Sequence, residues 1–572
     1  MRVLVIIAAI SVSITAWGAC TSAGTVLTAA SCSSTDVAAC FSLATGTTTQ
    51  INIPAGNCGW STQVSFTLPA SSTPLTIAGA STVSCSGTAG QSGYSCTATD
   101  NTIIADNYAG SGPILAIIPT ANSAEVRLTG LSFQGGSAGT GNDKYDGMVQ
   151  IGGASTNIRV DHSHFNVSTY SPALNSSAIQ FQGCMYGVID HSVFDSGTGT
   201  VNNQVRDYNS GTCFSDSLGL GDQSWAHSTS LGSSSFLYAE NNVFNNGFAN
   251  DCTNGGRFVF RFNNFNVASG NEIVQTHPTG GGGRIRGCRA WEIYSNYFNA
   301  TPGSYLNAGV WISSGTGMLW GNTFPSSSSG GGTGFKYAIE LLSMRVNNST
   351  YPQGVPPAGW GYCGTSSGLT GDGSNWDGSQ GTTGYPCLDT PGRGIGDLLT
   401  GGFTADGSGS NNVTNNATGC IYNQTCAYPR QALEPIYEWA DAYSPVPSNP
   451  SAVLGIGEGT FTNNTDYYLW CNASSQTGCT SYNGTVGVGS GVLASRPATC
   501  TAGVAYWATD QGSWNQSGNG TGNGVLYQCG AGNTWSTYYT PYTYPHPLES
   551  QVATAVATVG GQAVVGSNAA IF

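Results

Sequence analysis

A short pattern that ends in phenylalanine recurs along the first 324 residues of this chain. The seven copies end at Phe133, Phe165, Phe194, Phe244, Phe265, Phe298 and Phe324, with spacings of 32, 29, 50, 21, 33 and 26 residues. The gap of 50 fits either two coils or one coil with an insertion. Repeats of this length that each supply short strands predict a solenoid, because one unit buries its apolar face only by stacking on its neighbours.

Two positions of the repeat show which way its side chains point. The residue five places before the Phe is apolar in every copy: Leu128, Val160, Ile189, Ala239, Phe260, Ile293 and Leu319. The residue two places before it is Ser or Asn in six copies: Ser163, Ser192, Asn242, Asn263, Asn296 and Asn322. We expect the first column and the Phe column to face inward. The second column predicts a ladder at a turn, since Asn tolerates the left-handed backbone and stacked amides bond to one another.

Other segments complete the expected coil. Short strands lie upstream of several repeats, at Met148–Ile151, Ala178–Gln182, Arg284–Arg286 and Gly309–Ile312. Near the start, Ser33–Leu43 has the composition of an amphipathic helix, followed by strands at Thr49–Ala55 and Pro74–Gly79. A helix at this point would cover the open end of the solenoid. The sequence therefore predicts an all-β parallel β-helix with an N-terminal capping helix.

The repeat fades after Phe324, and the composition then changes twice. We assign residues 20–345 to the β-helix and 346–495 to Cys- and Gly-rich loops, with any final coils, packed on the solenoid. Residues 496–550 contain two strand patterns between Cys500 and Cys529 and predict a small disulfide-linked β module. Residues 551–572 are small and apolar and read as a tail.

Composition indicates an exported protein. Met1–Ala19 has one cation, an apolar run and small residues at its end, as a secretory signal peptide has. Cys20 follows directly, so lipid anchoring at Cys20 is the alternative to free secretion. The 18 cysteines favour disulfides in an oxidising compartment. The predicted location is thus extracellular, secreted or at the cell surface.

The net charge and the lengths of the apolar segments limit which partners the chain can bind. The net charge of -14 argues against nucleic acid, which would be repelled. No segment after the signal reaches the about 18 apolar residues that span a bilayer, so no transmembrane segment is expected. The sequence gives no oligomeric state.

The motifs resemble those of one known superfamily. Val160–His162 and Val188–His191, each followed by a ladder residue and Phe, are similar to the strand before the asparagine turn in pectate lyases. The start of the chain, with its helix and strands, is similar to the capped N-terminus of many secreted members. The chain thus resembles the pectate-lyase-like superfamily of right-handed parallel β-helix proteins over about residues 33–324. That resemblance implies a right-handed solenoid, an extracellular polysaccharide as partner and calcium as a candidate cofactor.

The first candidate site is the outward column four places before the Phe. Asp161, Asp190 and Glu240 stand in line there, and stacked carboxylates must bind cations or shift their pKa values. They are the candidate metal ligands, for calcium. Arg261, Tyr294 and Trp320 continue the column as candidate sugar-binding residues. The alternative is that the two Asp, with His162 and His191, only hydrogen-bond the adjacent turn, on the wall that lies away from the catalytic groove in pectate lyases.

The second candidate site is the upstream strand, which forms the substrate groove in pectate lyases. It contains Gln150, Gln180, Gln182, Asp251, Arg284, Arg286 and Trp311. Calcium-dependent members hold calcium with carboxylates and use an Arg as base, and an Arg is a base only where its pKa is strongly depressed. We predict Arg284, Arg286, Asp251 and His277 as catalytic, with Asp251 in register with Arg284. Only one clear acid stands in this column, fewer than calcium coordination requires.

We predict that residues around that strand bind the substrate. Arg289, Gln180, Gln182 and Trp311 join Arg261, Tyr294 and Trp320 as candidate substrate contacts. The structural alternative is that Arg257, Arg284, Arg286 and Arg289 pair with Glu272 and Glu292 around a Gly-rich turn. Both interpretations stay open on the sequence.

The leading functional hypothesis is binding and cleavage of an extracellular polysaccharide, by β-elimination if the sugar is an acidic uronate. The first alternative is a non-catalytic adhesin or matrix solenoid. The second alternative is an inverting glycoside hydrolase, which needs two carboxyl groups facing one groove.

Overall fold

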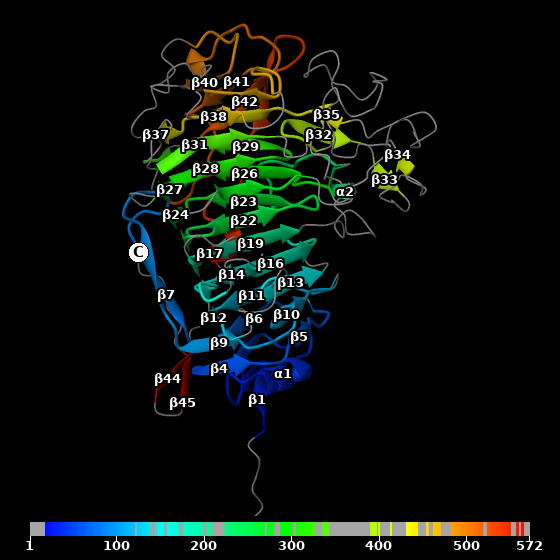
Figure 1. The fold of residues 1–572 in the computed structure, drawn as a ribbon, viewed down its shortest axis with the longest axis vertical. Coiled ribbons are helices and arrows are strands. Elements are labelled where there is room, and N and C mark those ends of the chain that lie inside the picture. Colours follow the sequence, from blue (N-terminus) through cyan, green and yellow to red (C-terminus); the bar gives the residue numbers. More distant parts are fainter. Residues whose placement is uncertain are drawn as a thin grey trace, which may run out of the picture.

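The computed structural model shows a parallel β-helix of three long sheets, with its axis vertical in Figure 1. It describes residues 18–71, 73–120, 123–137, 144, 146–153, 157–170, 176–197, 203–208, 222–225, 227–268, 272–278, 286–300, 305–325, 334–342, 389–396, 398–400, 412–414, 431–443, 454–456, 461–470, 482–518, 523–550, 556–559 and 562–565. Most of the predicted signal peptide and of the tail therefore lies outside the described residues. The predicted all-β parallel solenoid is confirmed.

Each coil contributes one strand to each sheet, and we name the sheets A, B and C. Sheet A contains, in spatial order, β1 (Cys20–Ala23), β2 (Val26–Ala29), β3 (Gln50–Asn52), β6 (Leu75–Ala78), β11 (Val126–Thr129), β14 (Ile158–Asp161), β17 (Gly187–Asp190), β20 (Leu237–Glu240), β23 (Arg257–Arg261), β26 (Ala290–Tyr294), β29 (Thr316–Trp320), β36 (Ile436–Trp439) and β39 (Tyr467–Tyr468). Only the β1–β2 pair in it is antiparallel.

The other two sheets are parallel throughout. Sheet B contains β4 (Gly56–Trp60), β9 (Thr102–Asp106), β12 (Ser132–Gly135), β15 (His164–Asn166), β18 (Val193–Asp195), β21 (Val243–Asn245), β24 (Asn264–Val267), β27 (Tyr297–Ala300), β30 (Thr323–Phe324) and β37 (Ala442–Tyr443). Sheet C contains β5 (Val64–Thr67), β10 (Leu115–Ile118), β13 (Val149–Gly153), β16 (Ser177–Gly183), β19 (Asn203–Tyr208), β22 (Phe248–Cys252), β25 (Glu272–Thr276), β28 (Tyr305–Ile312), β31 (Gly334–Leu341) and β38 (Leu454–Ile456). Strands β36 to β39 extend the solenoid beyond residue 345.

The predicted capping helix lies at the lower end of the solenoid in Figure 1 as α1 (Ser34–Leu43). The Ser33 side chain accepts a hydrogen bond from the Asp36 backbone N–H, so the helix begins where the Ser-Thr-Asp pattern predicts. Val37, Cys40 and Phe41 are buried against the first coil. The helix thus closes the end of the core that stacking would otherwise leave open.

Disulfides fasten the N-terminal coils and other parts of the chain. The bonds are Cys20–Cys40, Cys32–Cys58, Cys85–Cys96, Cys252–Cys288 and Cys500–Cys529. No cysteine in the described part of the chain is free. Because the Cys20 sulfur is bonded to Cys40, it is not available for a lipid, and the alternative of lipid anchoring at Cys20 is wrong for this structure. Within the described residues, no helix is long and apolar enough to cross a membrane.

The inward columns of the repeat form the core. The seven Phe rings follow one another along the axis, with Phe298 and Phe324 parallel at 4.7 Å between ring centres, and Tyr443 extends the stack. Leu128, Val160 and Ile189 pair in register on sheet A, as predicted. Stacking of like side chains at the rung spacing buries each coil's apolar face.

The predicted ladder is also confirmed. The Asn263 side chain donates to the Ala239 carbonyl oxygen and to the Asn296 amide oxygen, and accepts from the Asn242 backbone N–H, at 2.8–3.1 Å. Asn296 and Asn322 repeat the arrangement one coil later. Asp441 ends the series by accepting from Asn322. The ladder supplies hydrogen-bond partners for buried backbone groups at the turn between sheets A and B, and it fixes the register from coil to coil.

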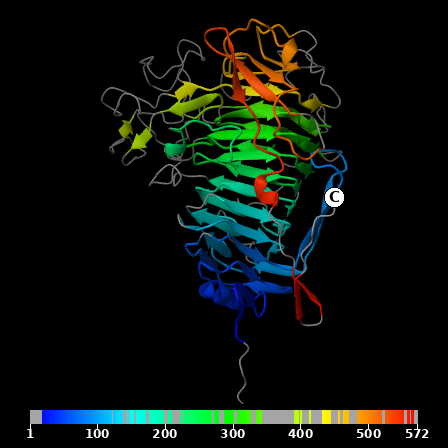
Figure 2. The same ribbon diagram turned by 180° about the vertical axis from the view of Figure 1, so that it is seen from behind.

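Two additions flank the solenoid. The antiparallel hairpin β7 (Thr82–Ser86) and β8 (Ser95–Thr99) runs along its side, joined by the Cys85–Cys96 disulfide. At the upper end, β40 (Val488–Gly491), β41 (Ala505–Ala508), β42 (Val525–Cys529) and β43 (Trp535–Tyr539) form a four-stranded sheet. From this module the chain returns down the outer face of sheet A to the turn η5 (Pro547–Ser550), as Figure 2 shows.

The remaining elements are short. They are α2 (Asp222–Trp225), β32 (Arg393–Gly396), β33 (Leu398–Thr400), β34 (Asn412–Thr414), β35 (Gln431–Leu433), β44 (Val556–Val559), β45 (Gln562–Val565) and η4 (Leu493–Ser495).

The sheet C strand between β22 and β28 is β25 (Glu272–Thr276). Of the predicted strand Arg284–Arg286, only Arg286 lies within the described residues, and it is not in a strand. Asp251 pairs with Gln275, so its predicted register with Arg284 is wrong. Ile273 and Val274 of β25 are both buried in the core.

We predict that the ladder contributes more to stability than the amide row on the outer face of sheet B. Asn263→Ala leaves the Asn242 N–H and the Ala239 carbonyl oxygen without their buried partner, at a cost of about 1–3 kcal/mol for each stranded group. The matched control is Asn299→Ala, because Asn299 is half-buried and donates one bond to Asn266. Denaturant unfolding of both variants measures this, and equal losses would contradict the role of the ladder.

Candidate functional site

The predicted groove on sheet C keeps part of its expected lining. Gln150, Gln180, Arg206, Asp251 and Gln275 occupy successive positions of one column, and Trp311 and Glu340 continue it. Gln180 is buried and accepts a hydrogen bond from Gln150 at 2.9 Å, whereas Gln182 is exposed. Trp311 is buried as well.

The three predicted catalytic residues that the structure describes, Arg286, Asp251 and His277, do not come together in an open site on that face. Arg286 is fully buried and binds Asp389 with both ends of its guanidinium, at 2.8–3.1 Å. The placement of Arg286 in an open groove is therefore wrong. Asp251 is buried beside Arg206, whose Nε donates to it at 3.1 Å. His277 is half-buried, with its Nδ1 3.0 Å from the Pro278 carbonyl oxygen. Arg284 lies outside the described residues.

The arginines of this region lie in a buried network. Arg289 pairs with Glu434 at 3.0 Å, and both Arg286 and Arg289 lie over the Trp225 ring. Burial and the neighbouring Arg289 lower the pKa of Arg257 to about 9, yet its guanidinium donates to backbone carbonyl oxygens inside the protein. Arg286 and Arg289 do pair with acidic side chains, as the structural alternative expects. Their partners are Asp389 and Glu434, not the expected Glu272 and Glu292. Glu292 instead bonds to Tyr539 and Gly232.

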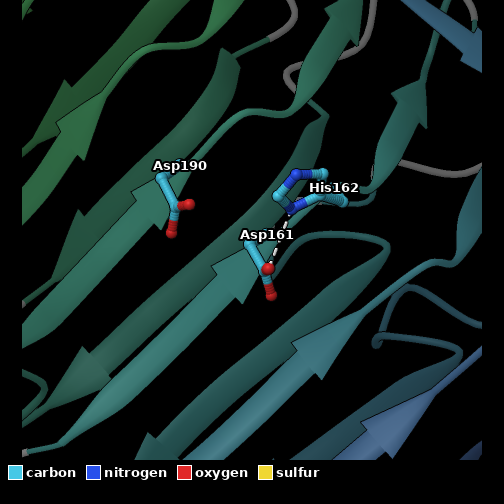
Figure 3. Close-up of side chains that lie close together, drawn as sticks. All are labelled: Asp161, His162 and Asp190. Carbon is cyan, nitrogen blue, oxygen red and sulfur yellow. Dashed lines mark hydrogen bonds and ion pairs between the residues drawn. The ribbon is translucent and has the colours of Figure 1, made fainter. Parts of the chain in front are cut away.

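The predicted metal ligands on sheet A are each held by an arginine. Arg159 bonds to Asp190 at 2.8 and 2.9 Å, Arg127 bonds to Asp161 in the same way, and the Arg261 Nε is 2.5 Å from Glu240. All three carboxyl groups are buried. One possible ligand atom from each of Asp161, His162 and Asp190 lies within 4.8 Å of the other two, and Figure 3 shows the three side chains. Because the guanidinium groups already neutralise the carboxylates, the arrangement has no negative charge to spare for calcium.

Arg261, Tyr294 and Trp320 do not face solvent. The Tyr294 and Trp320 rings are parallel, with their centres 4.4 Å apart, and both lie beneath Trp514 of the C-terminal module. The Arg261 guanidinium donates to the carbonyl oxygens of Tyr542 and Thr543. Their prediction as sugar-binding residues is wrong, because the C-terminal module makes this face a second hydrophobic core.

A groove of about 580 Å³ instead lies between sheets A and B. Its floor comes from one position of the repeat, three places before the Phe: His162, His191, Asn241, Phe262, Ser295 and Gly321. All six residues have positive φ, from 46° to 65°. The chain must turn sharply there from sheet A into sheet B, so each side chain stands out at the corner. The groove thus runs parallel to the axis across five rung steps, about 24 Å at the usual strand spacing.

The walls of the groove come from distant parts of the sequence. One wall is the hairpin, through residues 83–85, 87–89, 91 and Tyr94, and the other is the returning C-terminal segment, through Tyr544, Pro545 and Glu549. The Tyr94 hydroxyl donates to the Asn241 carbonyl oxygen at 2.6 Å, which holds the hairpin against the floor. Tyr544 stacks on Phe262 with 3.8 Å between ring centres. Sequence reasoning missed both walls, since neither belongs to the repeat.

Two stacked imidazoles occupy the lower end of this floor. The rings of His162 and His191 are nearly parallel, 5.3 Å apart, and their side chains are 41% and 32% exposed. The Nδ1 of His162 lies 2.9 Å from Asp161, and that of His191 lies 3.0 Å from Asp190. An ion-paired carboxylate only accepts, so each Nδ1 donates, and an unprotonated Nε2 has a lone pair that can accept. Neither Nε2 has a partner among the described residues.

Glu549 adds a carboxyl group without a charge. Burial, and after it the neighbouring Glu240 carboxylate, raise the pKa of Glu549 far above its usual range. It is therefore protonated at neutral pH and shares a hydrogen bond with Glu240. Asn241 donates to its other side at 3.4 Å. Glu549 is the only carboxyl group among the described residues that line the groove.

Comparisons of the chain with protein-family models, with curated proteins and with solved structures find no match. The function is therefore inferred from the residues and geometry of the groove.

His164 ties the base of the hairpin to the solenoid. Its Nδ1 lies 3.0 Å from Asp100, just after β8, and its Nε2 lies 2.9 Å from Asp195 on β18. Burial alone would lower the pKa of His164, but the hydrogen bonds and charges of Asp195 and Asp100 raise it above 6.5.

We predict that this tie stabilises the protein more in mild acid than in base. Because the folded pKa of His164 is raised, its contribution is complete below about pH 6.5 and is lost as the pH rises through the folded value. His164→Gln should lower the free energy of unfolding by about 1–3 kcal/mol near pH 5.5 and by less near pH 9. Chemical unfolding of both proteins across this range is the measurement, and a loss that grows with pH would contradict it.

Proposed function

We propose that this chain is a secreted, extracellular polysaccharide-binding protein that holds one extended glycan in the hairpin groove. The observation that supports this most is the floor of the groove, which presents one residue from each of six successive coils. A linear polymer lying along the axis would meet the partly exposed floor residues His162, His191, Ser295 and Gly321, whereas Asn241 and Phe262 between them are buried. A compact ligand would use only part of such a groove.

The lining has the chemistry that sugars require. Imidazole, hydroxyl and amide groups can exchange hydrogen bonds with sugar hydroxyls. The aromatic residues Tyr94, Phe262 and Tyr544 are themselves buried and shape the walls and floor. The five disulfides and the predicted signal peptide support an extracellular location.

Cleavage is the second candidate function, and the two imidazole lone pairs favour it. An Asp-held His with a free Nε2 is the arrangement of a general base. A β-eliminating enzyme also needs a cation against the uronate, and no Lys or Arg is among the described residues that line the groove. An inverting hydrolase needs two carboxyl groups, and these residues supply only Glu549. Binding is therefore the function that the described geometry supports best.

The proposal is tested by replacing the two groove histidines. His162→Ala with His191→Ala removes two hydrogen-bonding groups, each contributing about 0.5–1.5 kcal/mol, so glycan affinity should fall about 5- to 100-fold. The matched control is His227→Ala, because His227 is exposed and lies outside the groove lining. Binding is measured by calorimetry against a panel of linear oligosaccharides.

Three outcomes separate the functions. Tight binding without new reducing ends or ultraviolet absorbance supports a binding protein. Reducing ends without absorbance indicate hydrolysis, and absorbance of unsaturated uronates indicates elimination. If the double variant binds as the control does, the groove is not the glycan site.

A further inference from the structure

We infer that the glycan held in this groove is electrically neutral, not a uronate polymer. This inference rests on the proposed function and names the class of polysaccharide. Polyanions are recognised through exposed cations, whereas neutral sugars are recognised through uncharged hydrogen-bonding groups and aromatic surface. The two classes of ligand therefore leave different side chains on a binding surface.

Most of the Arg and Lys residues that the structure describes are buried. Eleven Arg and Lys residues lie in the described part of the chain, and nine of them are buried. The nine are Arg127, Arg159, Arg206, Arg257, Arg261, Arg286, Arg289, Arg393 and Lys144. The other two, Lys336 and Arg496, are half-buried and do not line the groove. With a net charge of -14 on the whole chain, a polyanion would be repelled before it reached the site.

The groove has no unpaired carboxylate charge among its described residues. Its described lining contains no Lys, Arg or Asp. Beneath the floor, Asp161 and Asp190 face the imidazoles, and Arg127 and Arg159 neutralise them. On the C-terminal wall, Glu549 is protonated, and the Glu240 beside it is paired with Arg261.

The lining also offers uncharged groups that the described structure does not use. The side chains of Ser84, Thr88, Gln91 and Ser295 line the groove, and they make no hydrogen bond to another described residue. Each has a hydroxyl or amide that can donate as well as accept. Together with the two Nε2 atoms, they give six uncharged hydrogen-bonding groups along the groove. A chain of sugar hydroxyls matches this set, because each sugar hydroxyl can also donate and accept hydrogen bonds.

The test compares neutral and anionic oligosaccharides of equal length. We expect neutral hexasaccharides, such as those of glucose, mannose or xylose, to bind with a Kd that hardly changes when salt is raised about tenfold, since no charge is paired. Oligogalacturonate and oligoguluronate should bind at least about tenfold more weakly. A Ser84→Lys variant places a cation in the groove and should strengthen binding of the anionic chains, while Ser86→Lys on the same strand, outside the lining, should not.

The outcomes of this test distinguish a failure of the neutral-ligand inference from a failure of the proposed glycan-binding function. Tighter binding of an anionic chain, weakened by salt, overturns the neutral ligand and leaves a glycan-binding groove. Failure of every glycan, neutral and anionic, overturns both. Neutral binding that is lost in the His162→Ala and His191→Ala double variant and kept in His227→Ala supports both.

Discussion

The hydrogen-bond ladder at the corner between sheets A and B is the constraint on which the rest of the structure depends. Each ladder asparagine donates to a backbone oxygen of the coil before and accepts from its neighbour in the series, so successive coils cannot slip against each other. The residue just before it is held with positive φ and stands outward at the corner. A ladder that keeps coils in register therefore also keeps a row of corner residues in line, of which Asn241 and Phe262 are buried and the others half-buried. The floor of the groove is that row.

A second constraint is the burial of charge on sheet A. Removing a carboxylate and a guanidinium from water is costly, and it is tolerated only where hydrogen bonds satisfy both groups. Here Arg159 bonds to Asp190 and also to the carbonyl oxygens of Leu548 and Glu549. Arg261 bonds to Glu240 and to Tyr542 and Thr543. The ion pairs thus hold the returning C-terminal segment, which becomes one wall of the groove. The same burial leaves few cations on the described surface.

The fold could be predicted because its signal repeats. The Phe column, the apolar column and the ladder each recur at fixed offsets, and stacking turns a sequence column into a spatial one. The sheet C strand of this coil was placed at Arg284–Arg286, because an Arg-Ile-Arg alternation resembles a strand pattern. The strand lies before the Gly-rich run, at Glu272–Thr276.

The site was harder to predict than the fold. The positions of Arg261, Tyr294 and Trp320 on sheet A were correct, but nothing local reveals that a module from residues 482–550 covers them. Asp161, Asp190, His162 and His191 were found on the repeat, and in the structure each Asp accepts from the neighbouring His and from an Arg. The groove walls require contacts such as Tyr94 with Asn241 and Tyr544 with Asn241, which join residues 147 and 303 positions apart.

The central claim is that the ligand lies along the hairpin groove and not on sheet C. Hydrogen exchange of backbone amides, with and without a saturating glycan from the panel, tests it most directly. We expect new protection in residues 82–99 and 544–549, and none on β13, β16 and β28. Protection confined to those three sheet C strands would contradict the account.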